Sequence, residues 1–233
     1  MNILAADTST TTLYLCLLTD TTKTSLALSG GQQHSENLVP KIIELTKNQN
    51  LKLTDLDLLV CTKGPGSFTG LRIAMSALKG ISLASNIPLV AIETNKLLAS
   101  TVSYFDGTIM SAIDARKKRF YISLFKNTER LTKDLDIDEN ETIELIKDEE
   151  KILITGPDSQ KFYDKLIKAG LFEKLPKLKV YVDNSKYDLA YHLAVLGKEE
   201  FKKNGAAPFG FGPSYIRKSD AEIALDKKIA EAN

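Results

Sequence analysis

A glycine-rich turn, Gly64-Pro65-Gly66-Ser67-Phe68-Thr69-Gly70, constrains the fold of this chain more than any other feature of the sequence. Before it, Leu56 to Thr62 is a continuous apolar run, which is typical of a strand buried on both faces. After it, residues 69–85 carry apolar side chains at helical spacing. A buried strand that leads through a tight turn into a helix indicates an α/β sheet.

The segments on either side of this turn favour the same fold class. Three short strands are predicted at residues 2–7, 13–19 and 24–30, and a helix at 35–47. Another strand is predicted at 88–92. Alternating strands and helices that follow a meander of three strands predict a sheet with mixed strand directions.

A second α/β unit is predicted to begin near Gly107, which divides the chain into domains at residues 1–105 and 106–233. Two units of similar size, each opening with strands, are compatible with a duplicated fold. Residues 134–150 hold nine acidic residues and one lysine, a run more typical of a solvated face or loose excursion than of a site. The predicted elements of this unit are strands at 109–113, 120–125 and 152–155 and helices at 158–169 and 186–203.

The charge balance argues against a chain that grips nucleic acid alone. Its 31 Lys and Arg residues nearly match 30 Asp and Glu residues, whereas phosphate binding usually requires a basic surface. The first seven residues lack a basic leader, and no run approaches the ~18 apolar residues of a membrane span, so a cytoplasmic location is expected. Cys16 and Cys61 lie in apolar runs and are predicted to be buried free thiols, which fits a reducing compartment.

Three places could carry chemistry, and the first is Asp7-Thr8-Ser9-Thr10 at the end of the first strand. Its carboxylate and hydroxyls could organise a phosphate or its metal ion. The alternative is a polar turn that bonds local backbone. Thr8 and Ser9 occupy positions where glycine would be needed for the backbone to approach phosphates closely, so ATP hydrolysis through this turn is not favoured.

The second place is the turn at 64–70. Its glycines and the helix start make a possible anion cradle, although the P-loop lysine is missing and Thr69 interrupts the dinucleotide fingerprint. The alternative is a structural turn with Ser67 or Thr69 as the N-cap.

The third place is the hairpin around Asp114, where four cations, residues 116–119, follow each other. The tip could touch a nucleotide or an RNA phosphate, or its charges could simply be solvated. An ion pair between Asp114 and Arg116 is a further alternative. Seven residues from the three places are predicted as possible nucleotide or phosphate contacts: Asp7, Thr8, Ser9, Gly64, Gly66, Ser67 and Arg116.

The sequence offers little material for a hydrolase or a metal enzyme. Its two histidines, His34 and His192, have no partners at metal-ligand spacing. We expect His34 to cap or contact the first helix and His192 to pack into a helix face. No catalytic residue and no metal ligand is predicted.

The helices at 35–47 and 69–85 carry more apolar surface than one sheet needs to bury. A line of small residues on the second helix would let another helix approach closely, either within the chain or from a partner. Ten residues make up the predicted partner interface: Leu38, Val39, Ile42, Ile43, Leu71, Ile73, Ala74, Ala77, Gly80 and Ala84.

Six segments together resemble the TsaB (YeaZ) family in their order and spacing. The 64–70 turn with its extension Leu71-Arg72-Ile73 is the most specific of them, and the resemblance covers nearly the whole chain. It implies the actin-like ATPase fold shared by sugar kinases and heat-shock ATPases, with two ribonuclease-H-like subdomains. The other segments are Ile3 to Ser9, His34 to Pro40, Ala77 to Gly80, Ile113 to Arg116 and Pro213 to Arg217.

The resemblance also implies a role in making N6-threonylcarbamoyladenosine at position 37 of tRNAs that read codons beginning with A. In that pathway TsaD transfers the group, TsaB pairs with TsaD through its first two helices, and the ATPase TsaE joins them. The expected partners are therefore TsaD, TsaE through the complex and tRNA indirectly. No cofactor is expected to be required, although a nucleotide could bind at the partner interface.

One departure from TsaD bears on catalysis. The two metal-binding histidines of TsaD correspond to about Thr94 and Leu98, which cannot replace imidazoles as ligands. A non-catalytic partner subunit is therefore the leading hypothesis. The alternatives are an ATP-dependent kinase or ATPase that uses Asp7 and the 64–70 turn, and a homodimer formed through the same helix faces.

Overall fold

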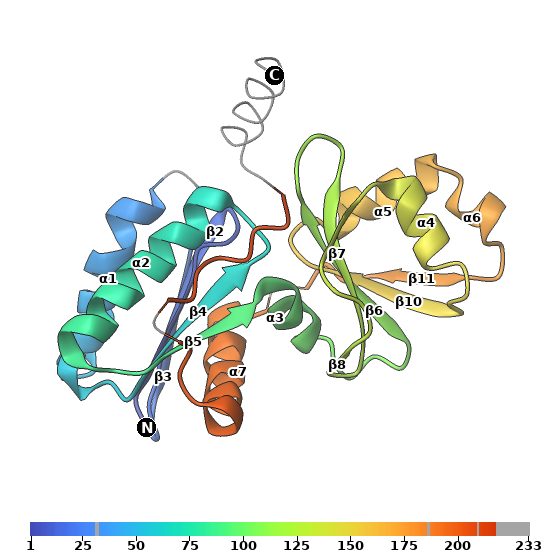
Figure 1. Ribbon diagram of the computed structural model, residues 1–233. Helices are drawn as coiled ribbons and strands as arrows, with labels where there is room; N and C mark the ends of the chain where they lie inside the picture. Colours follow the sequence, from blue (N-terminus) through green and yellow to red (C-terminus); the bar gives the residue numbers. More distant parts are fainter. Residues whose placement is uncertain (31–32, 186, 209, 218–233) are drawn as a thin grey trace, which may run out of the picture.

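The computed structural model describes residues 1–30, 33–185, 187–208 and 210–217. These residues form two α/β units that lie next to each other, and the chain crosses between them twice (Figure 1). None of the helices in these ranges is long and apolar enough to cross a membrane. The C-terminal tail beyond residue 217 lies outside the described residues.

The first unit is built on a five-stranded sheet with the order β3-β2-β1-β4-β5. β1, β2 and β3 form an antiparallel meander, and β4 and β5 run parallel to β1. All residues of β1 are buried, as expected for a central strand with helices on both faces. The meander and the mixed directions predicted from the sequence are confirmed. The strands are β1 (Ile3–Asp7), β2 (Thr12–Leu18), β3 (Lys23–Ser29), β4 (Leu58–Gly64) and β5 (Leu89–Glu93).

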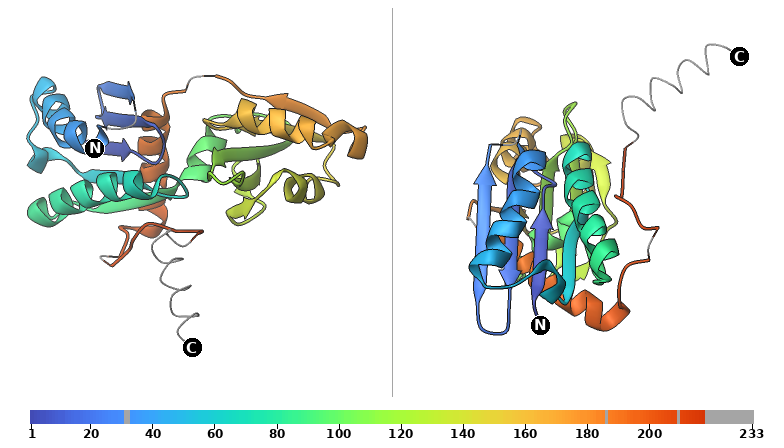
Figure 2. Two further views of the ribbon diagram at one scale, coloured as in Figure 1. Left: turned by 90° about the horizontal axis from the view of Figure 1, so that it is seen from above. Right: turned by 90° about the vertical axis from the view of Figure 1, so that its left-hand side faces the viewer.

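Two helices cover one face of this sheet side by side, α1 (His34–Asn48) and α2 (Phe68–Ser85) (Figures 1 and 2). A short 3-10 helix, Leu53–Asp55, connects α1 to β4. Helices α3 (Thr94–Ser100) and α7 (Leu189–Asn204) pack on the opposite face. Ser67 is the N-cap of α2, since its Oγ accepts a hydrogen bond from the Gly70 N–H at 3.2 Å.

The position of α7 corrects the predicted assignment of this helix to the second domain. Its buried Ala190, Leu193 and Ala194 pack against β1 and β4 of the first unit, and not within a C-terminal domain at 106–233. A Cβ on Gly197 would lie 2.4 Å from Val60 Cγ2, so α7 approaches β4 closely only because this position is glycine. The assignment of α7 was wrong because helical periodicity shows which face of a helix is apolar but not which sheet it covers.

The second unit repeats the topology of the first. Its sheet has the order β11-β10-β6-β7-β8, and β9 also pairs with β7. Antiparallel strands again form one side, and β10 and β11 run parallel to β6 on the other. This repeat supports the expectation of a duplicated fold. The strands are β6 (Thr108–Asp114), β7 (Phe120–Lys126), β8 (Glu129–Arg130), β9 (Leu135–Ile137), β10 (Lys151–Thr155) and β11 (Lys179–Val182).

Helices α4 (Glu139–Leu145), α5 (Ser159–Lys168) and α6 (Leu171–Lys174) belong to this unit. Phe162 of α5 packs against Phe120 of β7, with ring centroids 4.3 Å apart. The acidic run at 134–150 is not a loose excursion, because it contains β9 and α4. Asp138 caps α4 with a hydrogen bond from the Glu141 N–H at 2.9 Å.

Candidate functional site

A cleft of about 940 Å³ lies between the two units. Strands β1, β4, β6 and β10 all end at this cleft. Equivalent strand ends of the two duplicated sheets therefore face each other across it. Strand ends of this kind are where open α/β sheets bind ligands. The lining segments are residues 9–11, 34–35, 65–70, 113–117, 157–158 and 214–217, together with Ile73 and Tyr121.

Asp7 lies below the floor of this cleft and not in it. Its side chain is 1% exposed and accepts hydrogen bonds from Thr62 Oγ1 at 2.5 Å and from the Ser9 N–H at 2.8 Å. Burial raises the pKa of the Asp7 carboxyl, although these hydrogen bonds act in the opposite direction. Through its hydrogen bond from Thr62, the Asp7 carboxylate therefore links β1 to β4.

The turn after β1 is packed tightly against the glycine-rich turn. The Ser67 N–H donates to the carbonyl oxygen of Ser9 at 2.7 Å. A Cβ on Gly66 would lie 2.5 Å from that same carbonyl oxygen. Glycine is needed here because two backbone segments touch, and the Ser67 N–H is already used within the protein.

The seven predicted phosphate contacts separate into two groups. Ser9, Gly66, Ser67 and Arg116 line the cleft. The other three do not line it. Asp7 and Thr8 are buried, and Gly64, whose φ is 110°, packs against the carbonyl oxygen of Ser214.

The second unit supplies the β6–β7 hairpin to the opposite wall. Of the alternatives for this hairpin, an ion pair between Asp114 and Arg116 is not what the structure shows: Asp114 Oδ1 accepts the backbone N–H of Arg116 at 2.8 Å. Its Oδ2 pairs with Lys161 at 2.6 Å. Partial burial would raise the pKa of Asp114, but these two hydrogen bonds outweigh it and lower the pKa. Burial raises the pKa of the neighbouring Asp158.

Residues 214–217 close one end of the cleft and connect the two units. Arg217 donates to both carboxylate oxygens of Asp136 at 2.8 Å and to the carbonyl oxygen of Ala115 at 3.1 Å. Tyr215 stacks on Phe68 with ring centroids 4.3 Å apart. The sequence does not indicate these contacts, since the partners lie 81 to 147 positions away, and it singles out the Pro213 to Arg217 segment only through the family resemblance.

The histidines occupy structural positions. His34 is 7% exposed, and its Nε2 lies 3.0 Å from the carbonyl oxygen of Thr10, so this nitrogen carries the proton. This contact joins α1 to the turn after β1, as expected of a contact residue. His192 is half-buried on α7 beside the rings of Tyr187 and Tyr191. Among the residues that the structure describes, no His, Cys, Asp or Glu side chains form a group of three that could hold a metal ion.

Burial excludes four of the ten predicted interface residues from contact with a partner. Leu38, Ile42, Leu71 and Ala74 are core side chains no more than 1% exposed, so they cannot contact a partner. They face the sheet because the apolar stripes of α1 and α2, predicted to exceed what one sheet buries, are needed to cover β1, β2 and β4. Ile73 and Ala77 are half-buried.

The remaining four predicted interface residues are exposed. Val39 and Ile43 of α1 are 45% and 48% exposed, and Gly80 and Ala84 of α2 are exposed as well. Leu83 of α2, which was not predicted, is 63% exposed. We call Val39, Ile43, Gly80, Leu83 and Ala84 the α1–α2 apolar surface.

The fold and the cleft define a class of protein, the actin-like α/β proteins with two duplicated units. A protein from Bacteroides thetaiotaomicron described as having an actin-like ATPase fold matches 83% of this chain and 95% of its own, with a TM-score of 0.50 and 10% identity. YeaZ from Pseudomonas aeruginosa matches 92% of this chain and 99% of its own, with a TM-score of 0.72 and 22% identity.

Sequence comparison identifies the family within this class. A family model described as "TsaD: tRNA N6-adenosine threonylcarbamoyltransferase" matches residues 18–198. The "tRNA threonylcarbamoyladenosine biosynthesis protein TsaB" of Bacillus subtilis is 30% identical over 234 residues, covering 95% of this chain and 96% of its own. The protein of the same name from Escherichia coli is 29% identical over 131 residues, covering 55% and 57%. The chain belongs to the TsaB (YeaZ) family.

Proposed function

We propose that this chain is a non-catalytic partner subunit for threonylcarbamoyl transfer to N6 of adenosine 37 in tRNAs that read codons beginning with A. It acts by binding TsaD, the transferase, while TsaE joins through the complex. The observation that carries the proposal is the α1–α2 apolar surface in a member of the TsaB family. Exposed Val39, Ile43 and Leu83 have no role in the core, and burying them against a partner would stabilise a complex.

The geometry around Asp7 supports a role without ATP hydrolysis. A carboxylate that organises a nucleotide-bound metal ion must reach the cleft, whereas Asp7 is buried beneath it and bonded to Thr62. The turn after β1 packs against the glycine-rich turn and leaves little room between them. The competing function, a kinase or ATPase, would require both segments to open.

The test combines association and activity. Ile43→Glu with Leu83→Glu places two charges on the α1–α2 apolar surface. Ile167→Glu with Phe172→Glu places the same charges on two comparably exposed apolar residues of the second unit, 38% and 41% exposed, and serves as the matched control. Sedimentation with TsaD measures association, and transfer to tRNA is assayed with each protein omitted in turn.

We expect the α1–α2 variant to weaken association by about 30-fold or more, since central interface residues typically contribute 2 kcal/mol or more, and transfer to fall with it. The control variant should bind TsaD as the unchanged chain does. Equal binding by both variants would refute the proposed surface. A stable homodimer without TsaD, disrupted by the same substitutions, would favour self-association instead. ATP turnover by the pure chain, abolished by Asp7→Asn, would revive the enzyme hypothesis.

A further inference from the structure

The tip of the β6–β7 hairpin has an unusual backbone. Arg116, Lys117 and Lys118 all have positive φ values, 60°, 52° and 62°. The Arg119 N–H donates to the Arg116 carbonyl oxygen at 3.0 Å, so Lys117 and Lys118 are the central residues of a type I′ turn. Asn-Gly is the favoured pair at these positions, because side chains other than Asn and Asp resist the left-handed region. This chain places lysines there instead.

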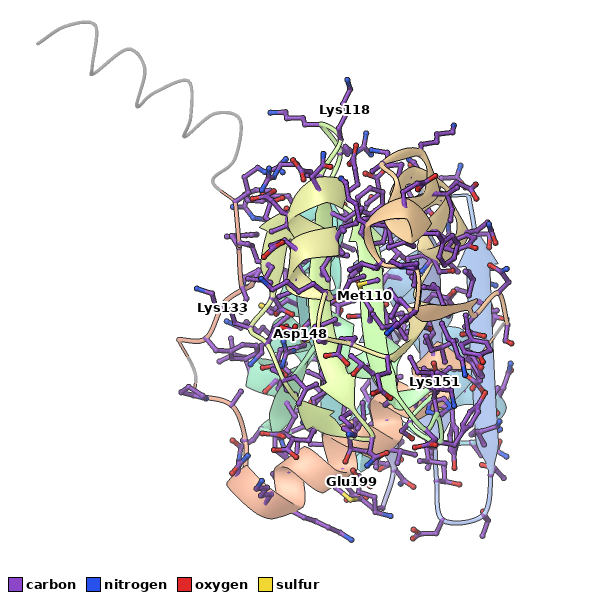
Figure 3. All side chains as sticks on the ribbon, turned by 90° about the vertical axis from the view of Figure 1, so that its right-hand side faces the viewer. Met110, Lys118, Lys133, Asp148, Lys151 and Glu199 are labelled. Atoms are coloured by element: carbon purple, nitrogen blue, oxygen red, sulfur yellow. The ribbon has the colours of Figure 1, made fainter. Side chains whose placement is uncertain are left out.

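The side chains of these three residues do not all face the same region. All three residues are exposed. Arg116 and Lys117 line the cleft, whereas Lys118 projects from the end of the hairpin, beyond the rest of the unit (Figure 3). We call these three residues the cationic tip. A single phosphate in the cleft would reach Arg116 but leave Lys118 unused.

Among the residues that the structure describes, the carboxylates near the tip bind groups other than the side chains of Arg116 and Lys118. Asp114 pairs with Lys161, and Asp136 binds both Arg119 and Arg217. Glu141 lies 3.0 Å from Arg119. Asp158 accepts the backbone N–H of Asp114 at 2.8 Å. Among the described residues, the Arg116 guanidinium has no hydrogen bond or ion pair, so positive charge remains at the tip although the whole chain is nearly neutral.

We infer that the cationic tip binds the phosphodiester backbone of RNA, with successive phosphates contacted by Arg116 at the cleft and by Lys118 outside it. An extended polyanion matches cations that point in different directions, and such contacts hold a nucleic acid in register without reading its sequence. Backbone strain that is kept at an exposed site is typical of function. This inference rests on the proposed function, which supplies tRNA as the RNA concerned.

The test relieves the backbone strain of the turn and removes its charges at the same time. Lys117→Asn with Lys118→Gly gives the turn its preferred residues and removes two charges. Lys168→Gln with Lys177→Gln removes two charges from exposed positions of the same unit and serves as the control. For each protein we measure the melting temperature, sedimentation with TsaD, and the Kd for unmodified tRNA over a range of salt concentrations, alone and in the complex.

We expect the Asn-Gly variant to melt at a higher temperature, to bind TsaD unchanged and to bind tRNA on the order of tenfold more weakly. Its plot of log affinity against log salt should be shallower by about 0.7–0.9, because the substitution of Lys118 removes one phosphate contact and with it the release of that many counterions. Arg116→Gln should lower the affinity further. The control should bind tRNA with nearly unchanged affinity and slope.

Three results would overturn the inference: unchanged tRNA affinity in the Asn-Gly variant, an equal loss in the control, or no tRNA binding by the unchanged chain alone or in complex. In the first case, a lower affinity of the same variant for ATP would assign the tip to a nucleotide. Failure of the unchanged chain to bind TsaD would refute the proposed function. In that case, tRNA binding by the chain alone would still decide the role of the tip.

Discussion

Gly70 lies directly against Thr8, across the junction between α2 and the turn after β1. The Thr8 Oγ1 donates a hydrogen bond to the Gly70 carbonyl oxygen at 2.6 Å, and a Cβ on Gly70 would lie 1.9 Å from the carbonyl oxygen of Thr8. The oxygen in this clash belongs to the backbone and the position of a Cβ is fixed by the backbone, so no side-chain rotation relieves it. The start of α2 is therefore fixed to the end of β1 by a contact that only glycine permits.

Gly70→Ala is expected to lower the free energy of unfolding by about 2–3 kcal/mol, because the added methyl group must push two elements apart. Gly80→Ala on the same helix is the control. Nothing lies within 4 Å of a Cβ at Gly80, so alanine there should raise stability by about 0.5–1 kcal/mol. Urea denaturation of both variants measures the difference, and similar values for the two would contradict the proposed packing.

Asp136→Ala is expected to lower the free energy of unfolding by about 1.5–3 kcal/mol, since two arginines, Arg119 and Arg217, would lose their shared carboxylate. The side chain of Asp136 is only 17% exposed, so solvent screens these bonds weakly. Glu129→Ala, at an exposed position of β8, should change stability by less than about 0.5 kcal/mol. Limited proteolysis near residue 217 should also accelerate in the Asp136 variant alone.

The buried carboxyl of Asp7 predicts a pH dependence of stability. An unfolded aspartate has a pKa of about 3.9, and burial raises the folded pKa above this value. The folded state therefore binds more protons between the two pKa values, and the free energy of unfolding falls as the pH rises through that interval. At pH values below this interval, Asp7 is protonated in both the folded and the unfolded state, so its titration does not lower the free energy of unfolding.

Asp7→Asn removes this titration. The stability of the unchanged chain relative to the Asn variant should therefore decrease as the pH rises above about 4 and level off above the folded pKa. Denaturant titrations between acidic and neutral pH measure this difference. A difference that does not change with pH would show that Asp7 does not have a raised pKa.

Both cysteines are predicted to be unreactive in the folded protein. Burial raises the pKa of the Cys16 thiol to about 11 and that of Cys61 to about 12, and both side chains are fully buried. Only the thiolate is a strong nucleophile, so iodoacetamide at pH 8 should modify neither residue until the chain unfolds. Complete modification in denaturant is the positive control. Fast labelling of the native protein would indicate local opening of β2 or β4.

Local sequence patterns were sufficient to predict the strands of the first sheet and the helices α1, α2 and α5. Each of these elements has a clear period, and the glycine-rich turn lies between β4 and α2 as predicted. Elements held by tertiary contacts were missed. Helices α3 and α4 and strands β8 and β9 are too short to show a clear period. In the acidic run, Asp134 pairs with Arg130 and Asp136 with Arg119, and these arginines lie outside the run.

For the candidate site, all three segments predicted from the sequence contribute residues to the lining of the cleft, but the sequence did not predict which of their side chains face it. Ser9 lines it whereas Asp7, two residues earlier, is buried, a distinction that depends on how the turn packs against Gly66. The interface prediction failed in the same way at Leu38 and Leu71, since an apolar stripe does not show which part a sheet will cover. Tyr215 and Arg217 could not be found because their contacts join distant parts of the chain.

The return of α7 to the first unit has a consequence for the order in which the protein forms during synthesis. All strands of the second sheet lie within residues 108–182, so that unit can complete its core as soon as these residues have left the ribosome. The first sheet is made earlier, but the face that holds Ile3, Ala5 and Val60 remains without α7 until residues 189–204 emerge. The half of the molecule that is synthesised first is therefore the half that finishes folding last.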